Sequence, residues 1–157
     1  MVMSVAHGGA QEATRLISEM GWNLGSVDEH CEIEEITKLN RNIMDGRVDI
    51  ASMIICLSNI PKPCVIQDSR FIYTYTKWLE LINDYILVYV DKAEIDIWRL
   101  HHKMDKYTSM STIRHEIDMA LKLYDKHTGP KVMIDGDAIE LPESQIILKD
   151  CLMELAG

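Results

Sequence analysis

One uninterrupted apolar run constrains the fold more than any other feature of the sequence. Residues 85–90 (YILVYV) are all aliphatic or aromatic, and the run ends at Asp91. A short apolar run rich in β-branched and aromatic residues predicts a strand that is buried on both faces. Such strands occur almost only in parallel sheets covered by helices. The run therefore favours an α/β fold.

The rest of the chain alternates between extended and helical patterns. Further strands are predicted at 2–6, 64–66 and 131–134, with a short extended segment at 22–27. Apolar residues recur at helical spacing between them, and this predicts helices at 10–20, 33–44, 48–57, 75–82, 93–103, 112–126 and 142–155. The alternation predicts a mostly parallel sheet in a three-layer α/β/α architecture. The 157 residues suffice for a single domain over 1–157.

Composition argues against several classes of protein. Asp and Glu number 25 against 16 Lys and Arg, and the formal charge of -9 argues against a broad nucleic-acid surface. The apolar stretch 51–57 is too short to span a bilayer, and 1–6 lacks the basic flank of a signal peptide, so we expect a cytoplasmic protein without a membrane partner. The four cysteines form no CxxC pair, which predicts neither a zinc site nor a disulfide framework.

Ligands of open parallel sheets bind outside the carboxyl ends of the strands. The turn His7-Gly8-Gly9 is expected at that edge, where its backbone amides could form an anion-binding nest beside the imidazole; a plain tight turn is the alternative. Asp68 and Arg70 follow a second strand. They could hold a magnesium-bound water and a substrate phosphate respectively, or simply form a salt-bridged strand end.

One histidine pair, one His-Glu pair and one aperiodic stretch lie in the second half of the chain. His101 and His102 point about 100° apart on a helix and cannot chelate one ion together, so we expect solvated helix surface there. His115-Glu116 lacks the second histidine of H-E-x-x-H, and we expect it on a helix surface or at a lid contact. The stretch 103–110 (KMDKYTSM) is predicted to form a mobile loop over the same edge of the sheet.

The order of these features resembles the nucleoside monophosphate kinases, the adenylate-kinase-like branch of the P-loop proteins. Residues 65–70 (VIQDSR) resemble the family's strand ending in D-G-F-P-R or D-x-R, whose arginine holds the acceptor phosphate. Residues 121–130 (LKLYDKHTGP) are similar to its R-L-x-x-Y-x-x-x-T-x-P, and 132–136 resembles its final strand. The strand at 85–91 and the following helix with Arg99 resemble the segments before the family's lid, where an arginine contacts donor phosphates.

The amino-terminal loop departs from the family pattern. When Thr14 is aligned with the threonine of G-x-x-G-x-G-K-x-T, Ala6 and Gln11 occupy glycine positions, Glu12 occupies the lysine position, and Gly9 is retained. Two unit charges about 4 Å apart interact by roughly 4 kcal/mol at an effective dielectric near 20, so this exchange of charge weakens phosphate binding by several kcal/mol. A carboxylate there also complements the positive end of the helix dipole and competes for the place of a phosphate. Ordinary ATP binding at this loop is therefore not expected.

The resemblance implies a P-loop-kinase-like fold with a short lid, and a nucleotide-binding protein that transfers a phosphoryl group to a (deoxy)nucleotide, with Mg²⁺ bound to the nucleotide. Two alternatives stay open: a catalytically inactive kinase-like subunit that has a protein partner or forms a homo-oligomer, and a nucleotide hydrolase with Asp68 or Glu12 as its acid or base. Arg41 enters because it approximately matches an arginine on the family's helix after the second strand. The assigned residues are Asp68, Arg70 and Arg99 for catalysis and His7, Gly8, Gly9, Thr14, Arg41 and Lys103 for nucleotide or phosphate binding, with no metal ligand.

Overall fold

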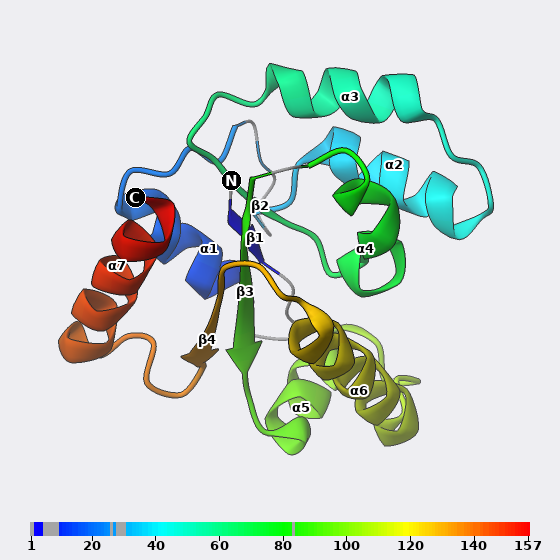
Figure 1. Cartoon of the computed structure of the whole chain (residues 1–157). Helices are drawn as coiled ribbons and strands as arrows, with labels where there is room; N and C mark the ends of the chain where they lie inside the picture. Colours follow the sequence, from blue (N-terminus) through cyan, green and yellow to red (C-terminus); the bar gives the residue numbers. More distant parts are fainter. Residues whose placement is uncertain (1, 5–9, 26, 28–30, 83) are drawn as a thin grey trace.

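A parallel sheet forms the centre of the molecule. The computed structural model describes residues 2–4, 10–25, 27, 31–82 and 84–157. Within them a 4-stranded sheet has the order β2-β1-β3-β4. Its strands are β1 (Val2–Ser4), β2 (Val65–Gln67), β3 (Ile86–Asp91) and β4 (Lys131–Asp135). All pairings are parallel, so the carboxyl ends of the strands share one edge of the sheet, and the arrowheads of β3 and β4 point to the end where α5 lies (Figure 1).

Helices cover both faces of this sheet. They are α1 (Ala10–Glu19), α2 (Glu34–Met44), α3 (Ile50–Asn59), α4 (Phe71–Leu79), α5 (Glu94–Met104), α6 (Met110–Lys126) and α7 (Pro142–Ala156). Ile86, Val88 and Val90 of β3 belong to a buried cluster with α1 and α7, whereas Leu87 and Tyr89 belong to a second cluster with α2, α3, α4 and α6. The strand predicted from its apolar run is therefore buried on both faces, and the expected three-layer α/β/α architecture is confirmed.

The described residues of the segment 22–27, which is predicted to be extended, lie beside β2 and do not form a strand of the sheet. It makes a single parallel bridge, between Asn23 and Cys64, within the described residues. Asn23 donates its N–H to Pro63 O at 2.8 Å, and Val65 N donates to Asn23 O at 2.9 Å. The flanking glycine Gly25 has a φ of +71°, which takes the chain out of the extended conformation. The segment thus covers the outer edge of β2 without extending the sheet.

Helix α4 begins before its predicted start at residue 75. The turn that follows β2 closes its first turn: Asp68 accepts a hydrogen bond from Arg70 N at its Oδ1 (2.8 Å) and another from Phe71 N at its backbone O (3.1 Å). Local side-chain acceptors of this kind set a helix start that apolar periodicity does not show. Only the turn at residues 68–70 therefore separates β2 from α4, and this places Arg70 at the edge of the sheet.

The predicted loop at 103–110 is shorter in the structure. α5 continues to Met104 and α6 begins at Met110, so the connection is limited to 105–109. Ser109 caps α6 by accepting from Thr112 N at 3.1 Å, and Trp98 Nε1 donates to the Thr108 carbonyl at 3.1 Å. α5 and α6 therefore form a tight helical hairpin at the carboxyl edge of the sheet.

The cysteines and the helix lengths complete the fold. Cys31, Cys56 and Cys64 are buried and Cys151 is half-buried, and all of them are free thiols. Within the described ranges, none of the helices combines the length and apolar character that a membrane crossing requires.

Candidate functional site

Arg70 is held at the carboxyl edge of the sheet by two carboxylates. Its Nη1 lies 3.1 Å from Asp68 Oδ1 and 3.6 Å from Glu32 Oε2. Asp68 is only 1% exposed, and its second oxygen accepts a hydrogen bond from Thr37 Oγ1 at 2.7 Å. A carboxylate that accepts several short hydrogen bonds in a buried position is fixed in orientation. The guanidinium of Arg70 is therefore held in one orientation, although a quarter of the Arg70 side chain is exposed.

Buried contacts of β2, α2 and α4 fix the position of Arg70. β2 is fully buried and delivers Asp68 and Arg70 to the edge of the sheet. α2 brings Thr37, and it is tied to α4 through the buried Asn40, whose Oδ1 accepts from Trp78 Nε1 (2.6 Å) and Thr74 Oγ1 (2.8 Å). Packing between α2 and α4 thus sets the distance between Thr37 and Asp68.

A cavity of about 250 Å³ opens beside Arg70. Side chains from the start of α4 and from the α5–α6 hairpin surround it: Ser69, Arg70, Tyr73, His101, Thr108, Thr112, Ile113 and Glu116. Tyr73 donates its hydroxyl to Glu116 Oε1 at 2.9 Å. Burial, together with this hydrogen bond to a carboxylate, raises the pKa of Tyr73 to about 12. The phenol therefore stays protonated at neutral pH and remains a donor.

Several of these residues were not predicted to belong to a site. His101, expected as solvated surface, is half-buried and lines the cavity, whereas His102 is exposed and stacks on Trp98 at 4.6 Å. His101 lies four residues after the buried Ile97, and this spacing could have placed it on the inner side of α5. Glu116 lies three residues after the buried Ile113 in the same way, and it accepts a hydrogen bond from Tyr73 of α4.

The remaining predicted cations lie outside the cavity wall. Arg41 is exposed in the last turn of α2. Arg99 and Lys103 are exposed on α5, and Arg99 lies 3.6 Å from Asp96. Since Arg99 and Lys103 are four residues apart, they share one side of α5, roughly opposite the side that carries His101. The structure therefore brings Asp68 and Arg70 together and leaves these three cations on the surrounding surface.

The structure describes only some of the residues that are predicted to form the phosphate-binding loop. His7, Gly8 and Gly9 lie outside the described residues. Ser4 is in register with Gln67, so the chain leaves β1 and β2 at the same edge of the sheet. That the first turn and residue 70 share this edge stays a prediction.

Helix α1 carries Glu12 and Thr14 of that loop pattern. Thr14 is fully buried, and its hydroxyl donates to Ala10 O at 2.6 Å. Glu12 is exposed in the first turn and lines a shallow cavity of about 150 Å³ with Glu140 and Gln145. The position where the family has a lysine therefore presents a carboxylate to solvent.

The described side chains offer Mg²⁺ no ready set of ligands. Mg²⁺ prefers carboxylate and hydroxyl oxygens with near-octahedral geometry. Asp68 already accepts from Thr37 and Arg70, and the Thr14 hydroxyl is turned toward Ala10 O. In the part of the chain that the structure describes, no three His, Cys, Asp or Glu side chains are grouped to hold a metal ion. We therefore derive no chemical step through a protein-bound metal.

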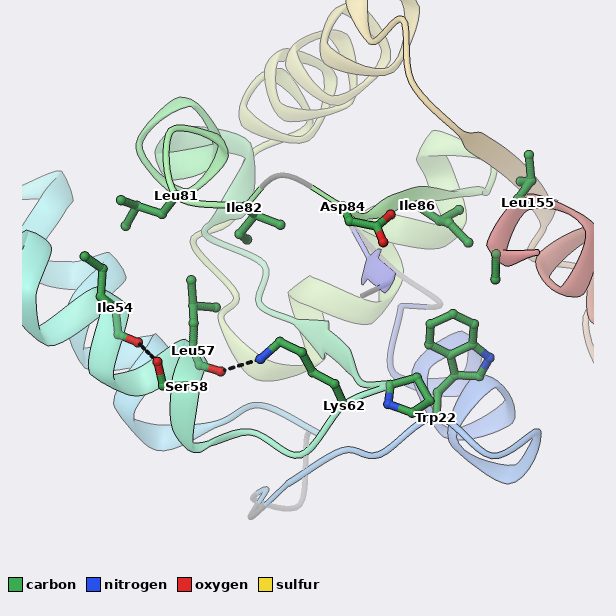
Figure 2. A pocket seen from close by; sticks show the side chains of 12 residues that line it. Trp22, Ile54, Leu57, Ser58, Lys62, Leu81, Ile82, Asp84, Ile86 and Leu155 are labelled. Atoms are coloured by element: carbon green, nitrogen blue, oxygen red, sulfur yellow. Dashed lines mark hydrogen bonds between the residues drawn. The ribbon is translucent and has the colours of Figure 1, made fainter.

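A larger cavity, of about 640 Å³, lies at the opposite end of the sheet (Figure 2). Pro63 and Ile86, at the amino ends of β2 and β3, line it together with Trp22 and Leu155. Lys62 contributes an ammonium group, but that group donates to Leu57 O at 2.9 Å. Because ligands of parallel sheets bind at the carboxyl ends of the strands, and because Arg70 lies there, we take the smaller cavity as the candidate site.

Comparison with known proteins supports the fold and leaves the substrate open. No protein-family model and no curated protein sequence matches the chain. Among solved structures, a gluconokinase from Sinorhizobium meliloti 1021 is similar, with a TM-score of 0.54 over 99% of this chain and 90% of that chain, at 14% sequence identity. At this identity the likeness concerns the fold alone. The chain thus has an α/β fold of the P-loop kinase type, and the likeness does not single out the nucleoside monophosphate kinases.

Proposed function

We propose that this protein is a kinase-like protein that binds a phosphorylated small molecule, a nucleoside monophosphate in the first instance, with Arg70 as the anion-binding residue. The observation that carries the proposal is the guanidinium held by Asp68 at the mouth of the cavity. Arginine binds phosphate through parallel N–H donors, and a fixed guanidinium loses little conformational freedom on binding. Asp68 acts in this proposal as the residue that positions Arg70.

The two carboxylates beside Arg70 have different roles in the proposal. Asp68 forms the shorter contact, at 3.1 Å, and keeps the guanidinium in place. The contact to Glu32, at 3.6 Å, lies beyond ordinary hydrogen-bond distance. In the proposal a phosphate that approaches from the cavity takes over the Nη1 donor that faces Glu32, and Asp68 remains bound.

The other residues that line the cavity suit a hydroxylated ligand. Thr108, Thr112 and Tyr73 contribute hydroxyl groups, and Glu116 contributes a carboxylate that can accept from sugar hydroxyls. The cavity, at about 250 Å³, is smaller than the roughly 300–1,000 Å³ typical of sites for drug-sized ligands. It therefore accommodates a phosphate and a sugar, and a base would extend beyond it.

Phosphoryl transfer would also need a donor site. We keep Arg99 and Lys103 as candidates for the charge on the donor side, with His7, Gly8, Gly9 and Thr14 at the phosphate loop, and Arg41 as a candidate that holds the substrate with Arg70. In such a reaction the protein contributes position and neutralisation of charge more than covalent chemistry. In this proposal Mg²⁺ arrives bound to the nucleotide.

Isothermal titration with a panel of nucleoside monophosphates, and with ATP in the presence and absence of Mg²⁺, tests the proposal. We expect at least one monophosphate to bind, and Arg70→Ala to weaken its binding by tenfold or more, since a charge-assisted contact contributes about 1.5–3 kcal/mol. Arg114→Ala is the matched control, because Arg114 is also paired with a carboxylate, Glu94 at 2.7 Å, and does not line the cavity. Absence of binding by every nucleotide, or equal losses in the two variants, would contradict the proposal.

A second candidate function is a binding or structural subunit that keeps the fold without the chemistry. The exposed Glu12 at the lysine position favours it, because a carboxylate repels the donor phosphates. A coupled assay for ADP release from the wild type beside Glu12→Lys separates the two functions. Wild-type turnover that Arg70→Ala abolishes would exclude the inactive subunit, and monophosphate binding without turnover would support it. Analysis of the nucleotide products in the same samples distinguishes hydrolysis from transfer.

A further inference from the structure

The two outer edges of the sheet differ in whether another segment of the described chain covers them. The outer edge of β2 is covered by its own chain, through the hydrogen bonds of Asn23 with Pro63 and Val65. At the other edge, within the described part of the chain, β4 pairs on one side only, with β3. An uncovered strand edge presents a row of N–H and C=O groups that can pair with a further strand.

The hydrogen bonds to β3 show which residues of β4 face outward. Leu87 N donates to Pro130 O at 3.0 Å, and Gly136 N donates to Asp91 O at 2.8 Å. In a parallel ladder alternate residues bond to the same neighbour, so the even-numbered residues 130–136 face β3. The N–H and C=O groups of Lys131, Met133 and Asp135 therefore face outward.

We propose that β4 is a dimerisation strand, which pairs antiparallel with β4 of a second copy of this chain about a twofold axis at Met133. This register is the one that brings all three outward residues of both strands into hydrogen-bonded pairs. It places Met133 opposite its counterpart, and Lys131 opposite Asp135 of the second copy, twice. The strand is thus complementary to itself in charge as well as in hydrogen bonding, as an isologous interface requires.

The side chains at this edge are compatible with the pairing. Met133 is 44% exposed, and Ile147 of α7, in the shallow groove beside the strand, is 68% exposed. The Lys131 ammonium donates one bond to Tyr124 O at 2.8 Å and retains further donors. Asp135 Oδ1 accepts from Asp137 N at 2.9 Å, and the carboxylate has a second oxygen for the partner.

The usual protections of an exposed strand edge are weak here. Proline, glycine and β-bulges discourage edge pairing, and β4 (KVMID) contains no proline or glycine. An outward lysine is another common protection, but in the proposed register Lys131 lies opposite Asp135 of the second copy, and its Nζ lies 4.5 Å from the ring centre of Tyr124. Apolar groups at Met133 and Ile147 then flank this edge, where the Asp135 carbonyl accepts one bond, from Ala138 N at 3.2 Å, and has a second lone pair for the partner strand. The inference is independent of the Arg70 cavity, which β4 does not line.

Sedimentation equilibrium of the full chain at micromolar concentration tests the proposal. We expect a dimer of about 36 kDa, twice the 18.0 kDa of one chain. Met133→Pro removes an outward N–H without removing a bond to β3, because proline is tolerated at the outward positions of edge strands. We expect this variant to be monomeric with a wild-type circular dichroism spectrum. A monomeric wild type overturns the proposal, as does a dimer that a folded Met133→Pro preserves.

A charge exchange keeps the proposal testable if Met133→Pro does not fold. Asp135→Lys opposes like charges in both pairs and should raise the dimer dissociation constant about tenfold, and Lys131→Glu with Asp135→Lys should largely restore it. In a Cys151→Ser background, a short bifunctional thiol reagent should join Met133→Cys chains and leave Ile55→Cys chains, exposed on α3, unjoined. The proposed register is overturned if the double charge exchange does not restore the dimer that Asp135→Lys weakens. It is also overturned if the reagent joins Met133→Cys chains and Ile55→Cys chains equally.

Discussion

Removal of the Asp68 carboxylate should destabilise the fold far more than removal of the similar carboxylate at Asp45. Both residues precede an arginine by two positions, with N–O distances of 3.1 Å for Asp68–Arg70 and 3.2 Å for Asp45–Arg47. The pairs differ in burial: the Asp68 side chain is 0% exposed and that of Asp45 is 65% exposed. The comparison therefore separates the effect of burial from that of contact geometry.

The expected loss in the free energy of unfolding follows from the groups that Asp68→Ala leaves without an acceptor. The substitution removes the acceptor for Thr37 Oγ1 and for the N–H and guanidinium of Arg70. Breaking a buried pair costs about 3–5 kcal/mol, and the lower end applies because Arg70 keeps partial exposure and its contact to Glu32. About 3 kcal/mol corresponds to a fall in Tm of about 6–12 °C for a domain of this size. Asp45→Ala should cost less than about 1 kcal/mol.

Chemical denaturation, with the free energy of unfolding from the linear extrapolation, measures both changes. A double-mutant cycle with Arg70→Ala should give a coupling energy of about 1–3 kcal/mol, because the two side chains share one network. A loss below about 0.5 kcal/mol for Asp68→Ala, or a coupling energy near zero, would refute the view that Asp68 holds Arg70.

Other regions of the fold give further predictions. Gly136→Ala should cost about 1–3 kcal/mol in denaturant unfolding, since a Cβ there would lie 2.9 Å from the Asp91 carbonyl oxygen; a neutral effect would contradict this close approach. Burial lowers the pKa of His127, so the unfolded chain takes up its proton first as the pH falls. Stability should therefore decrease below about pH 6.5, and His127→Gln should flatten this dependence, whereas parallel profiles would argue against it. Burial raises the pKa of Cys56 to about 11 and also raises that of Cys64. A thiol reagent at mildly alkaline pH should therefore label Cys151, which is half-buried, first in the native protein. Equal labelling of all four thiols would contradict the burial of the other three cysteines.

The alternation of strands and helices was predictable because each element carries its own signal. The apolar run of β3 and the helical spacing in α2 and α6 are local properties, and tertiary packing did not override them. The segment expected to be extended at 22–27 makes a bridge to Cys64 at Asn23 and leaves the extended conformation at Gly25, whose positive φ the composition does not reveal. The start of α4 was misplaced because Asp68 closes its first turn through its own oxygens.

The candidate site was predictable in part for a similar reason. Asp68 and Arg70 follow a buried strand, so their place at the edge of the sheet follows from the chain itself. Glu32 and Thr37 reach them from a distant segment, and no local pattern marks either residue. His101 and Glu116 carried a weak signal, their spacing from buried isoleucines, which shows the inward side of each helix.

The most direct test of the proposed function follows the Arg70 side chain itself. In ¹⁵N-labelled protein, the Nε–H signal of Arg70 should shift when a binding nucleoside monophosphate is added, together with the backbone amides of Thr112 and Glu116 at the same cavity. The Nε–H signal of Arg114 should stay in place. Shifts confined to the larger cavity at the opposite end, seen at the indole of Trp22 and the amide of Leu155, would contradict the proposed site.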